Sequence, residues 1–172
     1  VELAVGRLVG DTAADVNELL RNSLAGPDFE GTPRAVLASW DFQDLDLGAL
    51  RSVLNRVVAA GLEVDDETMI DNDLWVKDDL LDALGEPFSL HIHADHGNPW
   101  VVCAPPDKVH IDADDYEDAV ADHAPTSRPF YGFNDCKVGM SLVADGLTDR
   151  LVHLGASGVL AASDTAFGYD PG

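Results

Sequence analysis

Short apolar runs alternate with amphipathic segments along the chain, and this alternation limits the possible folds more than any other feature. The predicted strands are 35–39, 62–64, 88–93, 130–133 and 158–162, preceded by an apolar opening at 3–9. The predicted helices are 16–24, 47–58, 76–84, 113–122 and 142–154. Strands that alternate with amphipathic helices are typical of a parallel sheet with helices on both faces. The sequence therefore predicts an α/β protein, a three-layer α/β/α sandwich with a mainly parallel sheet.

One segment, 98–111, does not follow this alternation. It contains Pro99, Pro105 and Pro106 and has an irregular composition, so we expect a loop beside an active site. The 172 residues are most simply one domain, 1–172, large enough to bury a core. The sequence lacks an initiator Met and opens within a predicted strand. We expect a piece excised from a longer chain, whose other domains would be partners.

The charge of the chain excludes several classes of partner. Its 32 acidic residues outnumber its 10 basic residues, for a net charge of −22. Such a surface repels nucleic acid and anionic membranes, and no apolar run has the length of a membrane span. Acidic residues spread over the whole chain, together with few lysines, are typical of proteins from salt-loving (halophilic) organisms. The charge then reflects solvation and not chemistry.

Reactive side chains follow three of the predicted strands. Asp41 follows 35–39, His96 follows 88–93 and Cys136 follows 130–133. Parallel strands place functional groups just beyond their carboxyl ends, in the crevice formed there. These side chains are therefore expected to form one site.

The segment around His96 has two interpretations. Read as His91-x-His93-x-Asp95-His96, it matches the ligand string of metallo-β-lactamase-like hydrolases, since imidazoles and a carboxylate can hold zinc. However, the region before this string alternates helix and strand, unlike that fold. On a strand, His91 and His93 share one face and can be packed residues. A metal-dependent hydrolase stays an alternative.

The second interpretation is a thiol nucleophile with a histidine base. A nucleophilic cysteine needs a nearby base and backbone N–H groups that hold the developing oxyanion. His96 supplies the imidazole, Gly97 lets its N–H approach a substrate carbonyl, and the N–H of Cys136 is a second donor. Strand alternation suggests that the Asp135 side chain points away from the thiol. Cys103, within an apolar run, is expected to be a buried small hydrophobe.

Several motifs in order resemble the gingipain-type cysteine peptidases, relatives of the caspases. The matching segments are Ala4-Val5-Gly6-Arg7-Leu8, Leu37-Ala38-Ser39-Trp40-Asp41, Asp79-Leu80-Leu81-Asp82-Ala83-Leu84, Asp95-His96-Gly97 with Trp100, Phe133-Asn134-Asp135-Cys136-Lys137-Val138-Gly139, and 155–163. Each motif alone is weak, but their order and spacing extend the resemblance over nearly all of the chain.

This resemblance implies a caspase-like fold and an endopeptidase that acts on protein or peptide substrates through a thioester at Cys136, without a cofactor. His96 would be the acid/base and Asp41 a group that orients it, with Gly97 in the oxyanion hole. Trp100 and Asp164 would contact substrate, and the family suggests an extracellular or cell-surface location. Asp95 and Asp135 stand where the family usually has Gly and Ala. A catalytically decayed interaction domain is therefore a further alternative.

Overall fold

The computed structural model describes residues 12–26, 34–39, 52, 54–56, 58–59, 66–70, 75–105, 107–135, 138–139 and 145–161. The helices are α1 (Ala13–Ala25), α3 (Lys77–Leu84), α4 (Ala113–Val120), α5 (Ala124–Ser127) and α6 (Leu147–His153), and the described residues between 52 and 59 are helical as well. The strands are β1 (Arg34–Ser39), β2 (Asp66–Ile70), β3 (Leu90–Ala94), β4 (Gly97–Asn98), β5 (Val101–Ala104), β6 (Val109–Asp112), β7 (Phe130–Phe133) and β8 (Gly158–Ala161).

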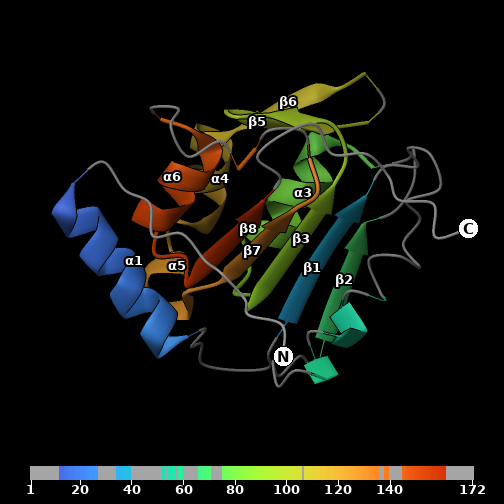
Figure 1. Ribbon diagram of the computed structural model, residues 1–172. Coiled ribbons are helices and arrows are strands. Elements are labelled where there is room, and N and C mark those ends of the chain that lie inside the picture. Colours follow the sequence, from blue (N-terminus) through green and yellow to red (C-terminus); the bar gives the residue numbers. More distant parts are fainter. Residues whose placement is uncertain are drawn as a thin grey trace, which may run out of the picture.

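The main sheet has five strands in the order β2-β1-β3-β7-β8, and every neighbouring pair is parallel (Figure 1). The predicted α/β class and parallel sheet are therefore confirmed. β3 lies at the centre, where Ala38 and Phe133 of its two neighbours both stand opposite His93. A central parallel strand is buried on both faces, and all of β3 is buried.

Each face of the sheet carries its own apolar core. One core joins Val36 and Tyr131 of the sheet to side chains of α3, α4 and α6. The other contains Leu37 and Ile92 and packs against Leu54, within the helical residues between 52 and 59. Apolar side chains are therefore buried on both faces of the sheet. Successive residues of β1 point alternately into the two cores, as expected for a strand.

The segment 98–111, expected to be an irregular loop, forms most of a small antiparallel sheet. Its order is β4-β5-β6, and Val102 and Ile111 are buried opposite one another in the β5–β6 pair. The prediction of a loop was wrong because Pro99 and Pro105 lie in the tight turns between strands and not within them. This small sheet directly follows the end of β3.

Two further strands differ from the predictions. The last strand was expected to be buried, but β8 ends the sheet order and Leu160 is 70% exposed. The strand β2 occupies Asp66–Ile70, a polar stretch that the sequence pattern did not identify. The predicted strand at 62–64 and the apolar opening at 3–9 lie outside the described residues.

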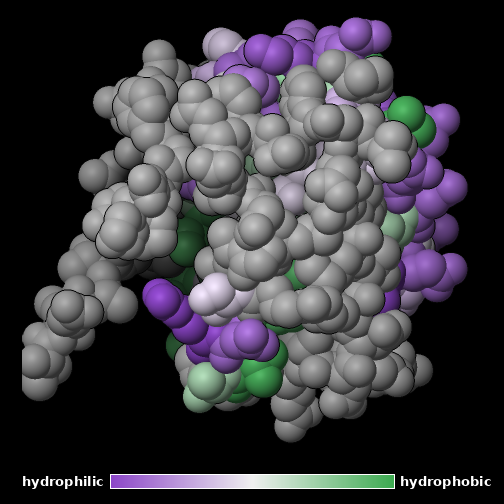
Figure 2. All heavy atoms as spheres, turned by 90° about the vertical axis from the view of Figure 1, so that its right-hand side faces the viewer, coloured by the Kyte–Doolittle hydropathy of each residue, from purple (hydrophilic) through white to green (hydrophobic). Residues whose placement is uncertain are grey.

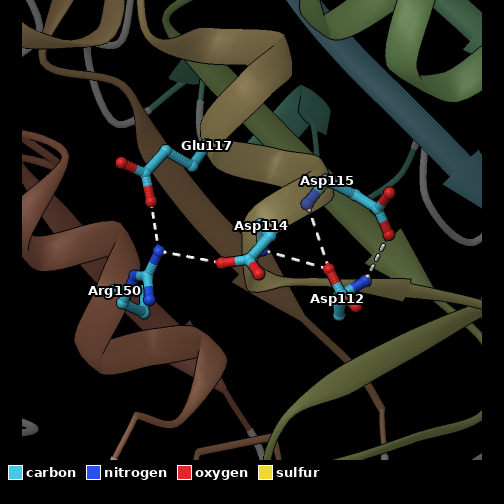
Figure 3. A network of polar contacts seen from close by, with 5 residues as sticks. All are labelled: Asp112, Asp114, Asp115, Glu117 and Arg150. Carbon is cyan, nitrogen blue, oxygen red and sulfur yellow. Dashed lines mark hydrogen bonds and ion pairs between the residues drawn. The ribbon is translucent and has the colours of Figure 1, made fainter.

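A polar network joins α4 to α6 (Figure 3). The Arg150 guanidinium of α6 contacts the carboxylates of Asp114, at 3.0 Å, and Glu117. At the start of α4, the Asp112 carboxylate accepts hydrogen bonds at 3.1 Å from the backbone N–H groups of Asp114 and Asp115. These contacts fix α4, which carries Tyr116 into the core beside β3.

The described surface has a hydrophilic rim. In the view of Figure 2, the side chains along the upper and right-hand margins are mostly hydrophilic. Among the described helices, none combines the length and apolar character needed to cross a membrane.

Candidate functional site

The candidate site lies at the carboxyl ends of the central strands. His96 follows β3 and Asp135 follows β7, and these two strands are direct neighbours in the sheet. The strands that precede His96 and Cys136 in the sequence are therefore side by side. Three predicted site residues, Asp41, Cys136 and Asp164, lie outside the described residues.

His91 is a buried structural residue. Its Nδ1 lies 3.0 Å from the Val36 carbonyl oxygen and its Nε2 lies 3.0 Å from the Tyr116 hydroxyl. The carbonyl can only accept, so Nδ1–H donates to it and Nε2 accepts from Tyr116. Burial, with the nearby His93, lowers the pKa of His91 to about 3. His91 is therefore a neutral imidazole with both nitrogens in use.

His93 forms a buried pair with Asp135. The His93 Nδ1 lies 2.9 Å from Asp135 Oδ1, and both side chains are fully buried. The same Asp135 oxygen accepts the backbone N–H of Asp95 at 3.0 Å. The Asp95 carboxylate in turn accepts the backbone N–H of His96. A chain of polar contacts thus leads from the core to the residue that precedes Gly97.

Burial and mutual attraction set the charges of this group. Burial lowers the pKa of His93, but the Asp135 and Asp95 carboxylates outweigh it and the pKa of His93 is raised. Burial raises the pKa of Asp135, and attraction to His93 opposes this only in part. Burial also raises the pKa of Asp95 to about 7. Near neutral pH the group therefore carries less negative charge than two free carboxylates would.

His96 differs from the other two histidines of β3 and its extension because it is only partly buried. Burial, together with the positive charge of Lys108, lowers its pKa below the ordinary value. Its backbone carbonyl accepts a hydrogen bond from the Cys103 N–H at 3.0 Å, which anchors it to β5. His96 is therefore a neutral, anchored imidazole near neutral pH, the form that a general base requires.

Gly97 is required by packing. A Cβ at this position would lie 2.8 Å from Asp135 Cβ, 2.8 Å from Val138 Cγ2 and 3.1 Å from the Val101 carbonyl oxygen. The sequence suggested that glycine leaves room for a substrate. The structure shows that it first leaves room for the segment that follows β7.

Trp100 and Cys103 have different environments. Trp100 lies in the turn between β4 and β5, where it is 50% exposed and its backbone N–H donates to Asn98 Oδ1. Cys103 is buried, as expected, and burial with the nearby Asp95 and Asp135 raises its pKa to about 11. A thiol with such a pKa is a poor nucleophile. Of these two side chains, Trp100 is the exposed one.

The alternative metal ligands do not gather around a common point. The described part of the chain contains no group of three or more His, Cys, Asp and Glu side chains that could hold a metal ion. His91 has both nitrogens occupied by protein partners, and His93 donates Nδ1–H to Asp135. His91 and His93 thus lie on β3 and Asp95 and His96 just after it, and all of them take part in hydrogen bonds within the protein.

The sequence did not predict the contact between Asp135 and His93. Alternation places Tyr131, Phe133 and Asp135 on one face of β7, and His91 and His93 on the same face of β3. With the register known, the contact would follow. The available signal was therefore an acidic residue and a histidine on the same face, near the ends of two predicted strands. The sequence does not directly record the register between those strands.

No protein-family model matches the chain, and curated proteins show no significant similarity to it.

Proposed function

We propose that this protein is a cysteine endopeptidase in which Cys136 is the nucleophile and His96 is the general acid/base. One observation carries the proposal: β3 and β7 are adjacent and parallel, so their carboxyl ends lie at the same edge of the sheet. In the sequence, His96 follows β3 and Cys136 follows β7. This is the position where α/β proteins hold their reactive groups. A caspase-like, gingipain-type variety of the fold belongs to the same proposal.

The described neighbours of Cys136 support this assignment. Asp135 precedes it in the sequence and contacts the backbone of Asp95. Val138 follows it and packs so closely against Gly97 that no side chain would fit there. The chain on either side of Cys136 thus contacts the residues on either side of His96.

The proposed chemistry is acyl transfer. Neutral His96 accepts the proton of the Cys136 thiol, and the sulfur attacks the carbonyl carbon of the scissile peptide bond. The backbone N–H groups of Gly97 and Cys136 stabilise the oxyanion. His96 then donates its proton to the departing amine, which leaves a thioester at Cys136. Water, activated by His96, hydrolyses the thioester and releases the free thiol.

Three further residues have proposed roles. Asp41, which follows β1, orients the His96 ring. Trp100, half exposed in the turn after β4, forms one wall of the substrate site. Asp164, which follows β8, favours a basic side chain before the scissile bond.

The proposal is tested with a peptidyl acyloxymethyl ketone that alkylates catalytic thiols, followed by mass spectrometry of the labelled peptide. We expect labelling of Cys136, and a loss of about 100-fold or more in labelling and peptide cleavage for His96→Ala, because general acid–base catalysis contributes that much. His110→Ala is the matched control, since His110 is an exposed histidine on the small sheet. Cys103→Ala, at the buried thiol, should also be labelled at Cys136.

Other outcomes would redirect the assignment. Cleavage that survives Cys136→Ala but is lost with a chelator and with His91→Ala would contradict the peptidase and favour the metal-dependent hydrolase. A folded protein with neither labelling nor cleavage would favour the decayed interaction domain.

A further inference from the structure

We propose that Asp135 is a positioning residue that fixes the segment Asp95-His96-Gly97 against the segment containing Cys136. This inference rests on the proposed function. Asp135 stands where the family that the chain resembles usually has Ala, and the proposed role explains why an aspartate is present.

The first support is the double contact of one carboxylate oxygen. Asp135 Oδ1 accepts a hydrogen bond from His93 Nδ1 at 2.9 Å and from the Asp95 N–H at 3.0 Å. Beside it, the Asn134 N–H donates to the His93 carbonyl at 2.9 Å. The chain beyond β7 is therefore bound by three hydrogen bonds to His93 and Asp95, at the end of β3. Hydrogen bonds to an ionised carboxylate are stronger than neutral ones, so Asp135 is suited to hold the two segments together.

The second support is contact on both sides of His96. Asp135 holds the Asp95 N–H, which precedes His96, and its Cβ lies where a Cβ of Gly97 would clash at 2.8 Å. The carboxylate of Asp95 also accepts the His96 N–H. Asp135, which follows the neighbouring strand, thus contacts the backbone both before and after His96.

The third support is the match of charge. An aspartate next to a nucleophilic cysteine would raise the pKa of the thiol if its charge were unpaired. Here the carboxylate points to fully buried His93, which bears the opposite charge when it is protonated, and the nearby carboxylates raise the pKa of His93. The cost of placing an acid beside Cys136 is therefore compensated locally.

The test compares three substitutions at position 135, each assayed below the unfolding temperature of every variant. Asp135→Asn keeps an acceptor oxygen in place and removes the charge. Asp135→Glu keeps the charge and displaces the oxygen by one methylene. Asp135→Ala removes the acceptor altogether. The readouts are the rate of Cys136 labelling, kcat and KM for peptide cleavage, and hydrogen exchange of the Asp95 amide.

We expect near wild-type labelling and exchange for Asp135→Asn. For Asp135→Ala and Asp135→Glu we expect kcat to fall about 100-fold with little change in KM, because small misplacement of a catalytic group has that effect. In both variants the Asp95 amide should exchange about tenfold faster or more, since it loses a hydrogen bond to a charged group. If Asp135→Ala does not fold, the Asn and Glu variants retain the comparison. Tyr131→Phe, a buried change on the same strand, should leave all readouts unchanged.

Three results would overturn the inference. One is wild-type labelling in Asp135→Glu or Asp135→Ala while the wild-type protein is active. Another is faster labelling in Asp135→Asn, which would show that the aspartate only repels the thiolate. The last is unchanged exchange of the Asp95 amide. By contrast, a wild-type protein that is neither labelled nor active refutes the proposed function itself.

Discussion

Asp95 and Asp135 are two acidic residues that hold the backbone around His96. In the sequence they are two negative charges beside the proposed nucleophile, at positions where the family that the chain resembles usually has Gly and Ala. In the structure both are buried, and each accepts a backbone hydrogen bond, Asp135 from Asp95 and Asp95 from His96. His93 lies within the same group and opposes their charge. These acids therefore belong to the framework that carries His96.

The titration of Asp95 predicts a pH dependence of stability. Its pKa is 3.8 in a model compound and about 7 in the folded protein, mainly through burial. Between these values the folded protein holds a proton that the unfolded chain releases, so the contribution of Asp95 to stability falls as pH rises. Asp95→Asn cannot titrate and still accepts the His96 N–H. We expect the free energy of unfolding of Asp95→Asn, relative to wild type, to increase by about 2 kcal/mol from pH 4 to pH 7.5, after allowance for solvent screening.

Urea unfolding at several pH values in this range measures the effect. Asp118→Asn, at an exposed position of α4, is the control and should show a difference from wild type that is nearly independent of pH. A difference for Asp95→Asn that stays constant across the range would contradict the assignment of a raised pKa.

The roles of single histidines could be predicted only in part. Alternation correctly placed His91 and His93 on one face, away from Leu90 and Ile92. It could not show that Asp135 reaches His93, because that contact depends on the register between β3 and β7. The sequence also suggested that Gly97 gives a substrate access to its N–H, which stays a prediction. The structure adds that the packing of Asp135 and Val138 requires a glycine there.

Helices and strands with a clear apolar pattern were predictable. β7 matches its predicted range, and α1, α3 and α4 lie within a few residues of theirs. The failures have common physical causes. β2 is mostly polar in sequence, and Pro99 and Pro105 stand in turns beside short strands that their presence concealed. Pairing with neighbouring strands, which no local pattern records, determines these segments.

The first turn of α4 gives a prediction for one helix. The Asp112 carboxylate accepts two backbone hydrogen bonds, and the Asp115 carboxylate accepts one from the Asp112 N–H at 2.8 Å (Figure 3). Removing such a cap costs about 1 kcal/mol. We expect Asp112→Ala to lower the free energy of unfolding by about that amount in urea titrations. Asp118→Ala, on the same helix but outside the cap, should change it by less than about 0.5 kcal/mol, and equal effects would argue against the cap.

The net charge of −22 belongs to the molecule as a whole. Repulsion among many acids favours the expanded, unfolded chain, because expansion separates the charges. The local ion pairs of Arg150 and Lys77 neutralise only a few of them. Stability should therefore depend on the surrounding salt more than it does in a protein of balanced charge.

Salt should raise the urea midpoint of unfolding. The screening length falls from about 30 Å at 0.01 M salt to about 3 Å at 1 M, so added NaCl removes most of the repulsion. A variant with exposed acids neutralised, Glu86→Gln with Asp118→Asn and Asp122→Asn, should show a weaker dependence on NaCl. A midpoint that does not rise with NaCl, or the same slope in the variant, would contradict this account.

The central position of β3 has a consequence for the order of folding. Its partners β1 and β7 come from distant parts of the chain, and parallel strands cannot pair through a tight hairpin. Such long-range pairing is slow to form, because a long loop must close before any contact compensates for the lost entropy. Local helices such as α3 and α4 can form early, whereas the meeting of β3 with β7 must wait. In a nascent or partly refolded chain β3 and β7 would not yet be paired, so the segments with His96 and Cys136 would still be apart. The proposed peptidase would therefore become reactive only when its sheet is complete.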